Sequence, residues 1–228
     1  MRLAIIPARG GSKRIPRKNI KNFHGKPIIA YSIHSAINSG CFDKVIVSTD
    51  DNEIAYVAKQ YGADVPFIRP VNISDDHATT LDVIQHALIW CEQQKWEVSD
   101  ACCIYATAPF LDAKDLARGL DLLQLQNVMY AFSATSFAFP IQRALKVDHE
   151  FNVSMFMPEN EQVRSQDLED AYHDAGQFYW GKADAFKKKL PIFLPHSKAV
   201  LIPRHRAQDI DTNDDWEYAK LLFSIVNK

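Results

Sequence analysis

The chain has 228 residues, of which 47% are hydrophobic and 24% are charged. A chain of this size buries a full core, so we predict a single domain over residues 1–228. Its formal net charge of -2 excludes a nucleic-acid-binding surface spread over the whole molecule. No apolar run reaches the ~18 residues of a membrane helix, and the run near the N-terminus is too short for a signal segment. We therefore expect a cytoplasmic protein that contacts neither nucleic acid nor a membrane.

Segments with strand and helix character alternate along the first two-thirds of the chain. Apolar runs predict strands at residues 3–6, 45–49, 101–105 and 130–134. Helical periodicity predicts helices within residues 27–40, 50–62, 80–94 and 113–125. Because crossovers between parallel strands pass over the sheet, this order predicts a doubly wound α/β fold with a mainly parallel, Rossmann-like sheet.

The alternation stops near residue 135. Residues from about 136 to 175 offer only short extended pieces, which predicts an inserted segment that carries a hairpin. An apolar run at 199–203 predicts a strand that returns to the core. Thr212 and Asp215 have the spacing of a helix start, so we predict a terminal helix after them.

Residues 3–19, LAIIPARGGSKRIPRKN, carry the strongest chemical signal of the chain. A strand leads into two adjacent glycines, Gly10 and Gly11, which we expect to adopt positive φ and to present backbone N–H groups to an anion. Ser12 adds a hydroxyl donor, and five cations surround it: Arg9, Lys13, Arg14, Arg17 and Lys18. The spacing is neither that of a Walker A loop nor that of a dinucleotide fingerprint. The pattern predicts a phosphate-binding loop; the alternative is a solvated turn with surface cations.

Two acidic groups are candidates for a metal or ligand site. Asp209 and Asp211 alternate around Ile210, so in an extended segment both carboxylates lie on one side, where they suit Mg²⁺. The alternative is an acidic cluster at a helix N-terminus. Asp50 and Asp51 follow a predicted parallel strand, at the edge where α/β sheets bind ligands, although Asp50 is equally suited to cap the next helix.

Three further parts of the chain bear on a binding site. Arg69 stands between a strand and Pro70, a poor place for a structural ion pair, so we predict ligand contact. Asp174 and Gln177 flank Gly176 in an aromatic stretch that is consistent with either a pocket or the core. For Thr79 and Thr80, helix capping is favoured over ligand contact.

These motifs together resemble the CMP-sialic acid synthetase family, the cytidylyltransferases that activate nonulosonic acids. The resemblance covers essentially the whole chain and rests on IPARGGSKRIPRKN, VSTDD, the RP…SDDHATTLDVIQHAL block, TAP at 107–109 and QDIDTNDDW. Within the family, FPIQRALKV, RSQDLEDAYHDAGQFYWGK and CCIYATAPFL are most similar to the branch that acts on pseudaminic acid. Tyr105 stands where the sialic acid branch has a glutamine associated with sugar recognition, which argues against a sialic acid pocket.

The resemblance implies transfer of CMP from CTP to the anomeric hydroxyl of an acidic nine-carbon sugar, with release of pyrophosphate. It implies catalytic roles for Arg9, Lys18 and Asp211, and Mg²⁺ as a cofactor on Asp209 and Asp211. The residues that would bind the nucleotide are Ala8, Arg9, Gly10, Gly11, Ser12, Lys13, Asn19, Arg69 and Thr80. Those that would bind the sugar are Tyr105, Gln142, Arg143, Arg164, Asp174 and Gln177.

The resemblance further implies a homodimer in which the inserted segment reaches the partner's pocket. Two alternatives remain open at this point. In the first, the acceptor is another ulosonic acid, such as sialic, legionaminic or deoxyoctulosonic acid. In the second, the chain is a nucleotide-sensing protein that has kept the fold without turnover.

Overall fold

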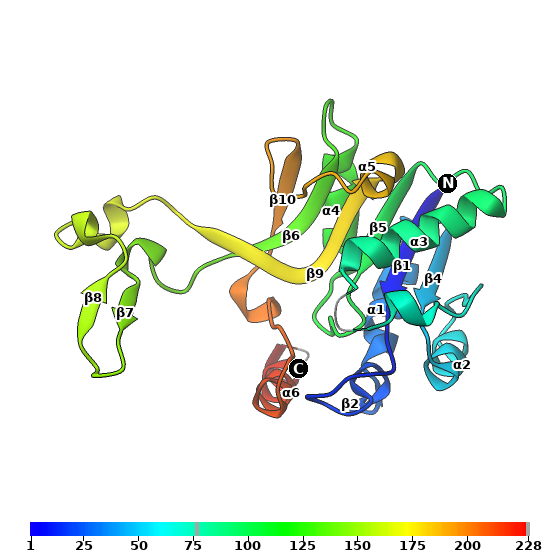
Figure 1. The fold of residues 1–228 in the computed structure, drawn as a ribbon, viewed down its shortest axis with the longest axis horizontal. Coiled ribbons are helices and arrows are strands. Elements are labelled where there is room, and N and C mark those ends of the chain that lie inside the picture. The colour runs from blue at the N-terminus through cyan, green and yellow to red at the C-terminus, as the bar shows by residue number, and fades with distance from the viewer. Residues whose placement is uncertain (76–77, 227–228) are drawn as a thin grey trace.

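A six-stranded mixed sheet forms the centre of the computed structural model, which describes residues 1–75 and 78–226 (Figure 1). Part of the motif around Arg69, at residues 76–77, lies outside the described residues. The strand order is β10-β6-β9-β5-β1-β4, and only β9 runs antiparallel to its neighbours. The strands of this sheet are β1 (Arg2–Pro7), β4 (Lys44–Ser48), β5 (Asp100–Ile104), β6 (Tyr130–Ser136), β9 (Tyr172–Lys182) and β10 (Ser197–Leu201).

Helices cover both faces of the sheet, as predicted for a doubly wound fold. Successive residues of a strand face opposite sides, so β1 sends Ala4 and Ile6 into one apolar cluster and Leu3 and Ile5 into another. The first cluster packs under α1, α2 and α4, and the second under α3 and α5. The helices are α1 (Ile29–Asn38), α2 (Asn52–Gln60), α3 (Thr80–Gln93), α4 (Ala113–Leu123), α5 (Ala183–Lys187) and α6 (Asn213–Val226).

Short elements connect these layers. Two small antiparallel sheets of two strands each lie outside the main sheet. One pairs β2 (Asn22–Phe23) with β3 (Lys26–Pro27), and the other pairs β7 (Leu145–Val147) with β8 (Val153–Met155). Single 3₁₀ turns occur at η1 (Lys18–Ile20), η2 (Val71–Ile73), η3 (Ile141–Arg143), η4 (Pro158–Asn160), η5 (Ser165–Asp167) and η6 (Arg204–Arg206). Among the described residues, no helix is long and apolar enough to cross a membrane.

A third apolar cluster joins the two ends of the chain. Ile15, which follows β1, is buried together with Ile210, which precedes α6. The aromatic rings of Phe23 and Trp216 pack edge to face in the same cluster, with ring centroids 5.4 Å apart. The basic stretch after β1 is therefore held against the acidic segment before α6 by apolar burial.

The sequence prediction was wrong about one strand. We predicted an inserted segment up to about residue 175 and no strand directly after it. The structure instead has β9, whose 11 residues begin at Tyr172 and pair with both β5 and β6. Gly176, with φ of 61°, lies where the pairing of β6 and β9 shifts register between Phe132 and Ala134, so this glycine accommodates an irregularity within a strand. The strand lacks an alternating pattern because its later part, from Gln177 to Gly181, is buried on both faces.

The segment between β6 and β9 extends away from the body of the molecule, and we call residues 137–171 the arm (Figure 1). It contains the predicted hairpin, formed by β7 and β8. Most of its apolar side chains are exposed, with Phe139 at 83% and Phe151 at 84% of full exposure. A single chain therefore leaves the arm's apolar residues uncovered.

Candidate active site

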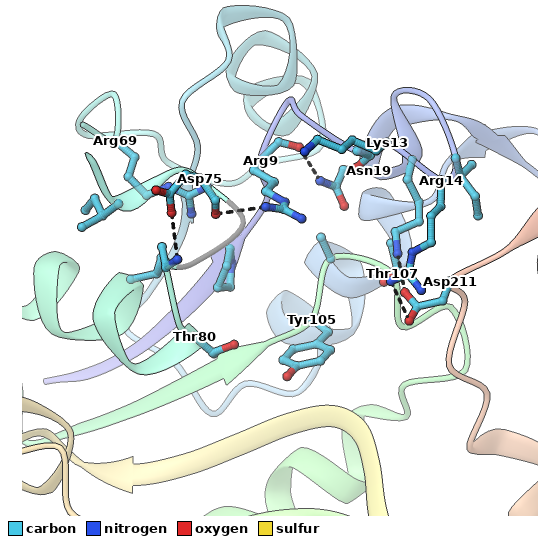
Figure 2. Close-up of a pocket in the computed structure, with 18 residues that line it drawn as sticks. Arg9, Lys13, Arg14, Asn19, Arg69, Asp75, Thr80, Tyr105, Thr107 and Asp211 are labelled. Carbon is cyan, nitrogen blue, oxygen red and sulfur yellow. Dashed lines mark hydrogen bonds and ion pairs between the residues drawn. The ribbon is translucent and has the colours of Figure 1, made fainter. Parts of the chain in front are cut away.

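A cavity of about 340 Å³ opens at the carboxyl ends of β1 and β5, the edge at which open α/β sheets bind ligands (Figure 2). Its wall comes from three parts of the chain: the basic stretch after β1, the segment from Arg69 to α3, and the segment after β5. Asp211, from the segment before α6, closes one side. The lining residues are Pro7, Arg9, Ser12, Lys13, Arg14, Ile15, Lys18, Asn19, Arg69, Ile73, Asp75, Ala78, Thr80, Val83, Tyr105, Ala106, Thr107 and Asp211.

Asp211 faces two cations of the basic stretch. Its Oδ2 lies 2.9 Å from Arg14 Nη2, and its Oδ1 lies 3.3 Å from Lys18 Nζ. Lys18 Nζ also donates to the carbonyl of Ile210 at 2.6 Å. Figure 2 shows the side chains of Arg14 and Asp211 meeting at one side of the cavity. The structure thus brings Lys18 and Asp211 together, as the prediction of a shared site requires.

Arg9 and Asn19 connect the walls of the cavity. The Arg9 guanidinium donates through Nη1 to the carbonyl of Asp75 at 3.0 Å, and the Asn19 amide donates to the Arg9 carbonyl at 2.9 Å (Figure 2). Asn19 is buried, whereas Lys13 is exposed at the rim. The loop therefore offers several donors and positive charges to a single cavity, which is the composition that an anionic ligand needs.

The glycine pair behaves differently from the prediction. Neither Gly10 nor Gly11 has positive φ. Gly10 is required by close approach instead, because a Cβ there would lie 2.7 Å from Asp51 Oδ2. The Gly10 N–H donates to Asp50 Oδ1 at 3.0 Å, and the Ala8 N–H donates to the Ser48 carbonyl at 3.0 Å. Ala8, Gly10 and Gly11 do not line the cavity.

Arg17 points away from the cavity, although it belongs to the basic stretch. Its φ is 55°, and its guanidinium bonds both carboxylate oxygens of Asp51 and also contacts Glu53. Asp51 also accepts the N–H groups of Glu53 and Ile54, so Asp51, and not Asp50, caps α2. The hydrogen bond from Arg17 is the main reason why the pKa of Asp51 falls to about 2.

Arg69 does form a structural ion pair, contrary to the reasoning from its position before Pro70. Its side chain is almost fully buried and lies 3.7 Å from Asp50 Oδ1 through Nη2. It donates to Ser74 Oγ at 3.1 Å and to the Ser48 carbonyl at 3.3 Å. Burial lowers the pKa of the Arg69 guanidinium, while Asp50 opposes that change. Arg69 nevertheless lines the cavity.

Asp209 and Asp211 precede the terminal helix. Thr212 Oγ1 accepts the Asp215 N–H at 3.2 Å, and Asp215 Oδ2 accepts the Thr212 N–H at 2.8 Å, which confirms the predicted helix start. Desolvation and then the charge of Asp211 raise the pKa of the Asp209 carboxyl. Within residues 1–75 and 78–226, no three acidic, histidine or cysteine side chains gather as a metal site.

A smaller cavity of about 160 Å³ adjoins the first, and the two share Thr80 and Tyr105. The Tyr179 hydroxyl donates to Asp174 Oδ2 at its wall. Burial is the main reason why the pKa of Tyr105 is raised. The other lining residues are mostly apolar: Leu81, Cys103, Phe186, Ile192 and Phe193. Thr79, not Thr80, caps α3, in a reciprocal capping box with Asp82.

The remaining predicted sugar residues do not reach either cavity within one chain. Gln142 and Arg143 donate to the carbonyls of Glu169 and Val163, and Arg164 forms an ion pair with Asp167 at 2.7 Å, all within the arm. Gln177 is buried in β9, where its Nε2 donates to the Arg206 carbonyl and its Oε1 has no hydrogen-bond partner among the described residues. One chain therefore leaves these four residues outside the cavity walls.

Sequence reasoning missed Thr107 and Asp75 as cavity residues. Thr107 lies two residues after Tyr105 in the segment that leaves β5, and both line the cavity. The TAP motif at 107–109 was the available signal. Asp75 contributes through its backbone carbonyl, for which side-chain chemistry gives no sign.

Comparisons with known proteins identify the family of this chain. The sequence profile of the cytidylyltransferase family matches residues 3–214. The chain is 48% identical to the pseudaminic acid cytidylyltransferase of Campylobacter jejuni, over 98% of this chain and 96% of that protein. It is 39% identical to a longer Helicobacter pylori protein that joins a pseudaminic acid cytidylyltransferase to a hydrolase, over 91% of this chain and 40% of that protein.

A solved structure of CMP:2-keto-3-deoxy-manno-octonic acid synthetase complexed with CTP has the same fold. Its TM-score is 0.72 at 17% identity, and the match covers 98% of each chain. The predicted doubly wound, mainly parallel fold is therefore confirmed. With a profile match over nearly its entire length and a loop, sheet edge and cavity arranged as described, this chain belongs to the cytidylyltransferase family.

Proposed function

We propose that this cytidylyltransferase transfers CMP from CTP to the anomeric hydroxyl of pseudaminic acid and releases pyrophosphate. The observation that carries the proposal is one cavity that Arg9, Ser12, Lys13 and Lys18 line together with Asp211. The oxygen of the sugar hydroxyl releases its proton to water and forms a bond to the α-phosphorus of CTP. The bond from that phosphorus to the oxygen shared with the β-phosphate breaks, and pyrophosphate leaves with the electron pair.

The basic loop supplies the electrostatic part of this proposal. Arg9, Ser12, Lys13 and Lys18 bind the triphosphate, and their charges stabilise the pyrophosphate as it departs. Asn19 and Arg69, which line the same cavity, contact the nucleoside, with Thr80 beside them. Positioning by fixed charges of this kind accounts for much of the catalysis of phosphoryl and nucleotidyl transfer.

Mg²⁺ is the cofactor that we propose, and the acidic residues fit it. Mg²⁺ is commonly bound by one or two carboxylates together with substrate phosphates and water, so a third protein ligand is not required. The charge of Asp211, which lines the cavity, contributes to the raised pKa of the Asp209 carboxyl, which does not line it, and a bound cation would relieve this repulsion. Asp209 and Asp211 would hold the ion, which would supply positive charge at the phosphates.

Pseudaminic acid is the proposed acceptor because of the relatives named above and because of Tyr105. The N-acylneuraminate cytidylyltransferases of Escherichia coli and Danio rerio are 30–34% identical over 95–96% of this chain and 49–51% of those proteins, which is lower than the 48% of the Campylobacter protein. Tyr105, Asp174 and Tyr179 supply polar groups to the otherwise mainly apolar second cavity beside the nucleotide cavity, and we place the sugar there.

We further propose a homodimer, working in the cytoplasm, in which the arm of one chain completes the partner's sugar site. The exposed Phe139 and Phe151 support an interface on the arm. In this arrangement Gln142 lies beside the partner's sugar, and Arg143 and Arg164 provide guanidinium groups that match the sugar carboxylate. Mixing Asp211→Ala protein with Arg143→Ala/Arg164→Ala protein should restore activity through mixed dimers. No recovery after verified subunit exchange would contradict the shared site.

The reaction is tested by incubating the full-length protein with CTP, Mg²⁺ and one acid sugar at a time. Pseudaminic, sialic, legionaminic and deoxyoctulosonic acids form the panel, and mass spectrometry identifies the nucleotide sugar. We expect CMP-pseudaminic acid as the main product. A different main product would correct the acceptor, while CTP binding without pyrophosphate release for any sugar would favour a nucleotide-sensing protein.

A further inference from the structure

The two consecutive carboxylates after β4 contact both ends of the basic loop. Asp50 Oδ1 accepts the N–H of Gly10, the first glycine of the loop, at 3.0 Å. Asp51 binds the guanidinium of Arg17, seven residues further on. The loop between Gly10 and Arg17 contains Ser12, Lys13 and Arg14, which line the cavity. The ends of the cavity-lining loop are thus fixed to one point of the sheet.

Asp50 has a second contact that extends this connection. The same Oδ1 atom lies 3.7 Å from Nη2 of Arg69, which lines another wall of the cavity. Asp50 itself does not line the cavity, and its side chain is 26% exposed. One carboxylate oxygen therefore contacts both the phosphate-binding loop and a buried arginine without reaching the ligand space.

We propose that Asp50 is a positioning residue for CTP binding, because it holds the Gly10 end of the basic loop and Arg69 in one fixed arrangement. This inference rests on the proposed function. A loop already held in its binding conformation loses less conformational freedom when the ligand binds, so the ligand binds more tightly. Asp51 holds the other end of the loop, where its contact with Arg17 also secures the cap of α2.

The sign of the effect separates positioning from simple electrostatics. Asp50 is negative and lies close to a cavity that would hold a negatively charged triphosphate. If Asp50 acted only through its charge, its removal would strengthen CTP binding, because repulsion would decrease and the charge of Arg69 would no longer be neutralised. A positioning role predicts the opposite, weaker binding.

The test is calorimetric titration of CTP into the full-length protein with Mg²⁺, well below the melting temperature of each variant. For Asp50→Ala we expect the CTP dissociation constant to rise about tenfold or more, as expected when a charge-assisted hydrogen bond is lost. Asp50→Asn should lose less, since its amide oxygen still accepts from Gly10. Asp121→Asn, an equal charge change at an exposed position of α4, should not alter the constant.

Steady-state kinetics provides the second readout. In Asp50→Ala the KM for CTP should rise, while the KM for the sugar stays within about twofold, because the second cavity is not lined by the loop. A purely structural role would lower the melting temperature and leave CTP binding unchanged at low temperature. If Asp50→Ala does not fold, the same measurements are made on Asp50→Asn, whose side chain has nearly the same shape as that of aspartate.

Unchanged or tighter CTP binding by Asp50→Ala, beside normal binding by the wild-type protein, would overturn this inference alone. A greater Mg²⁺ requirement in Asp50→Asn with an unchanged CTP constant would also overturn it, because Asp50 would then act on the metal. Wild-type protein that binds no CTP would overturn the proposed function and this inference with it.

Discussion

Lys18 Nζ lies 3.3 Å from Asp211 Oδ1, although 193 positions separate these residues along the chain. The contact is possible because Ile15 and Ile210 are buried in the same apolar cluster, which fixes the two segments side by side. The pair stands at the wall of the main cavity. Taken alone, the basic loop fits a solvated turn and the acidic segment fits a helix N-terminus. Their contact joins them in one site.

Replacing Asp211 tests the acidic side of the cavity. We expect Asp211→Ala to lower kcat by at least ~10²-fold, the magnitude for loss of a group that acts on transition-state charge. Pyrophosphate release from CTP and pseudaminic acid is the measurement. Asp214→Ala removes an exposed carboxylate from the first turn of α6 and should retain turnover. Near-normal turnover of Asp211→Ala at limiting Mg²⁺ would reject the metal assignment.

The packing of Gly10 leads to a stability prediction. In Gly10→Ala the new Cβ would meet Asp51 Oδ2 at 2.7 Å, and Asp51 is held by Arg17 and by the cap of α2. Because the loop has to shift, the free energy of unfolding should fall by roughly 1–3 kcal/mol. Urea denaturation measures this free energy of unfolding. A Cβ on Gly11 meets nothing within 4 Å, so Gly11→Ala should be unchanged or more stable by up to ~1 kcal/mol.

The Arg17–Asp51 pair makes stability depend on acid pH. The pKa of Asp51 is lowered from 3.8 to about 2, so this carboxylate stabilises the fold above its unfolded pKa and ceases to do so as the pH falls toward 2. Arg17→Ala should lower the free energy of unfolding at pH 7 by ~1–2 kcal/mol, which is less than the full pKa shift corresponds to because Arg17 is 38% exposed and water screens the pair. The variant should also make the decrease of this free energy between pH 5 and pH 2 shallower.

Urea unfolding at a series of pH values checks this prediction. Arg164→Ala removes an ion pair between two exposed side chains of the arm and should change stability by less than about 1 kcal/mol. Parallel pH profiles for Arg17→Ala and the wild-type protein would contradict the role given to the pair.

A buried ion pair secures the segment that leads to Asp209 and Asp211. Asp115 is 4% exposed at its side chain, and its Oδ2 lies 2.6 Å from Nη1 of Arg206. Asp115→Ala leaves the guanidinium without that partner and should cost about 3–5 kcal/mol of unfolding free energy, measured by urea denaturation. Arg118→Ala, which removes the exposed partner of the same carboxylate, should cost less than about 1 kcal/mol. Equal losses in both variants would count against this assignment.

The amino-acid sequence by itself was enough to predict the features that depend on neighbouring residues. The continuous apolar runs, which alternate with helical segments along the chain, predicted the parallel strands. The spacing of Thr212 and Asp215 predicted the start of α6. The cations after β1 marked the loop that lines the cavity. Such features depend on residues within about one helical turn or one strand, so local periodicity and capping chemistry reveal them.

Only the tertiary structure decided which residues meet. β9 inserts antiparallel between β5 and β6, and the burial of residues 177–181 on both faces leaves no alternating pattern in the sequence. Asp50 and Asp51 are chemically identical, yet one holds Gly10 and the other caps α2, because adjacent side chains at the end of a strand point to different neighbours. Long-range packing of apolar residues such as Ile15 and Ile210, which local sequence does not encode, placed Asp211 beside Lys18.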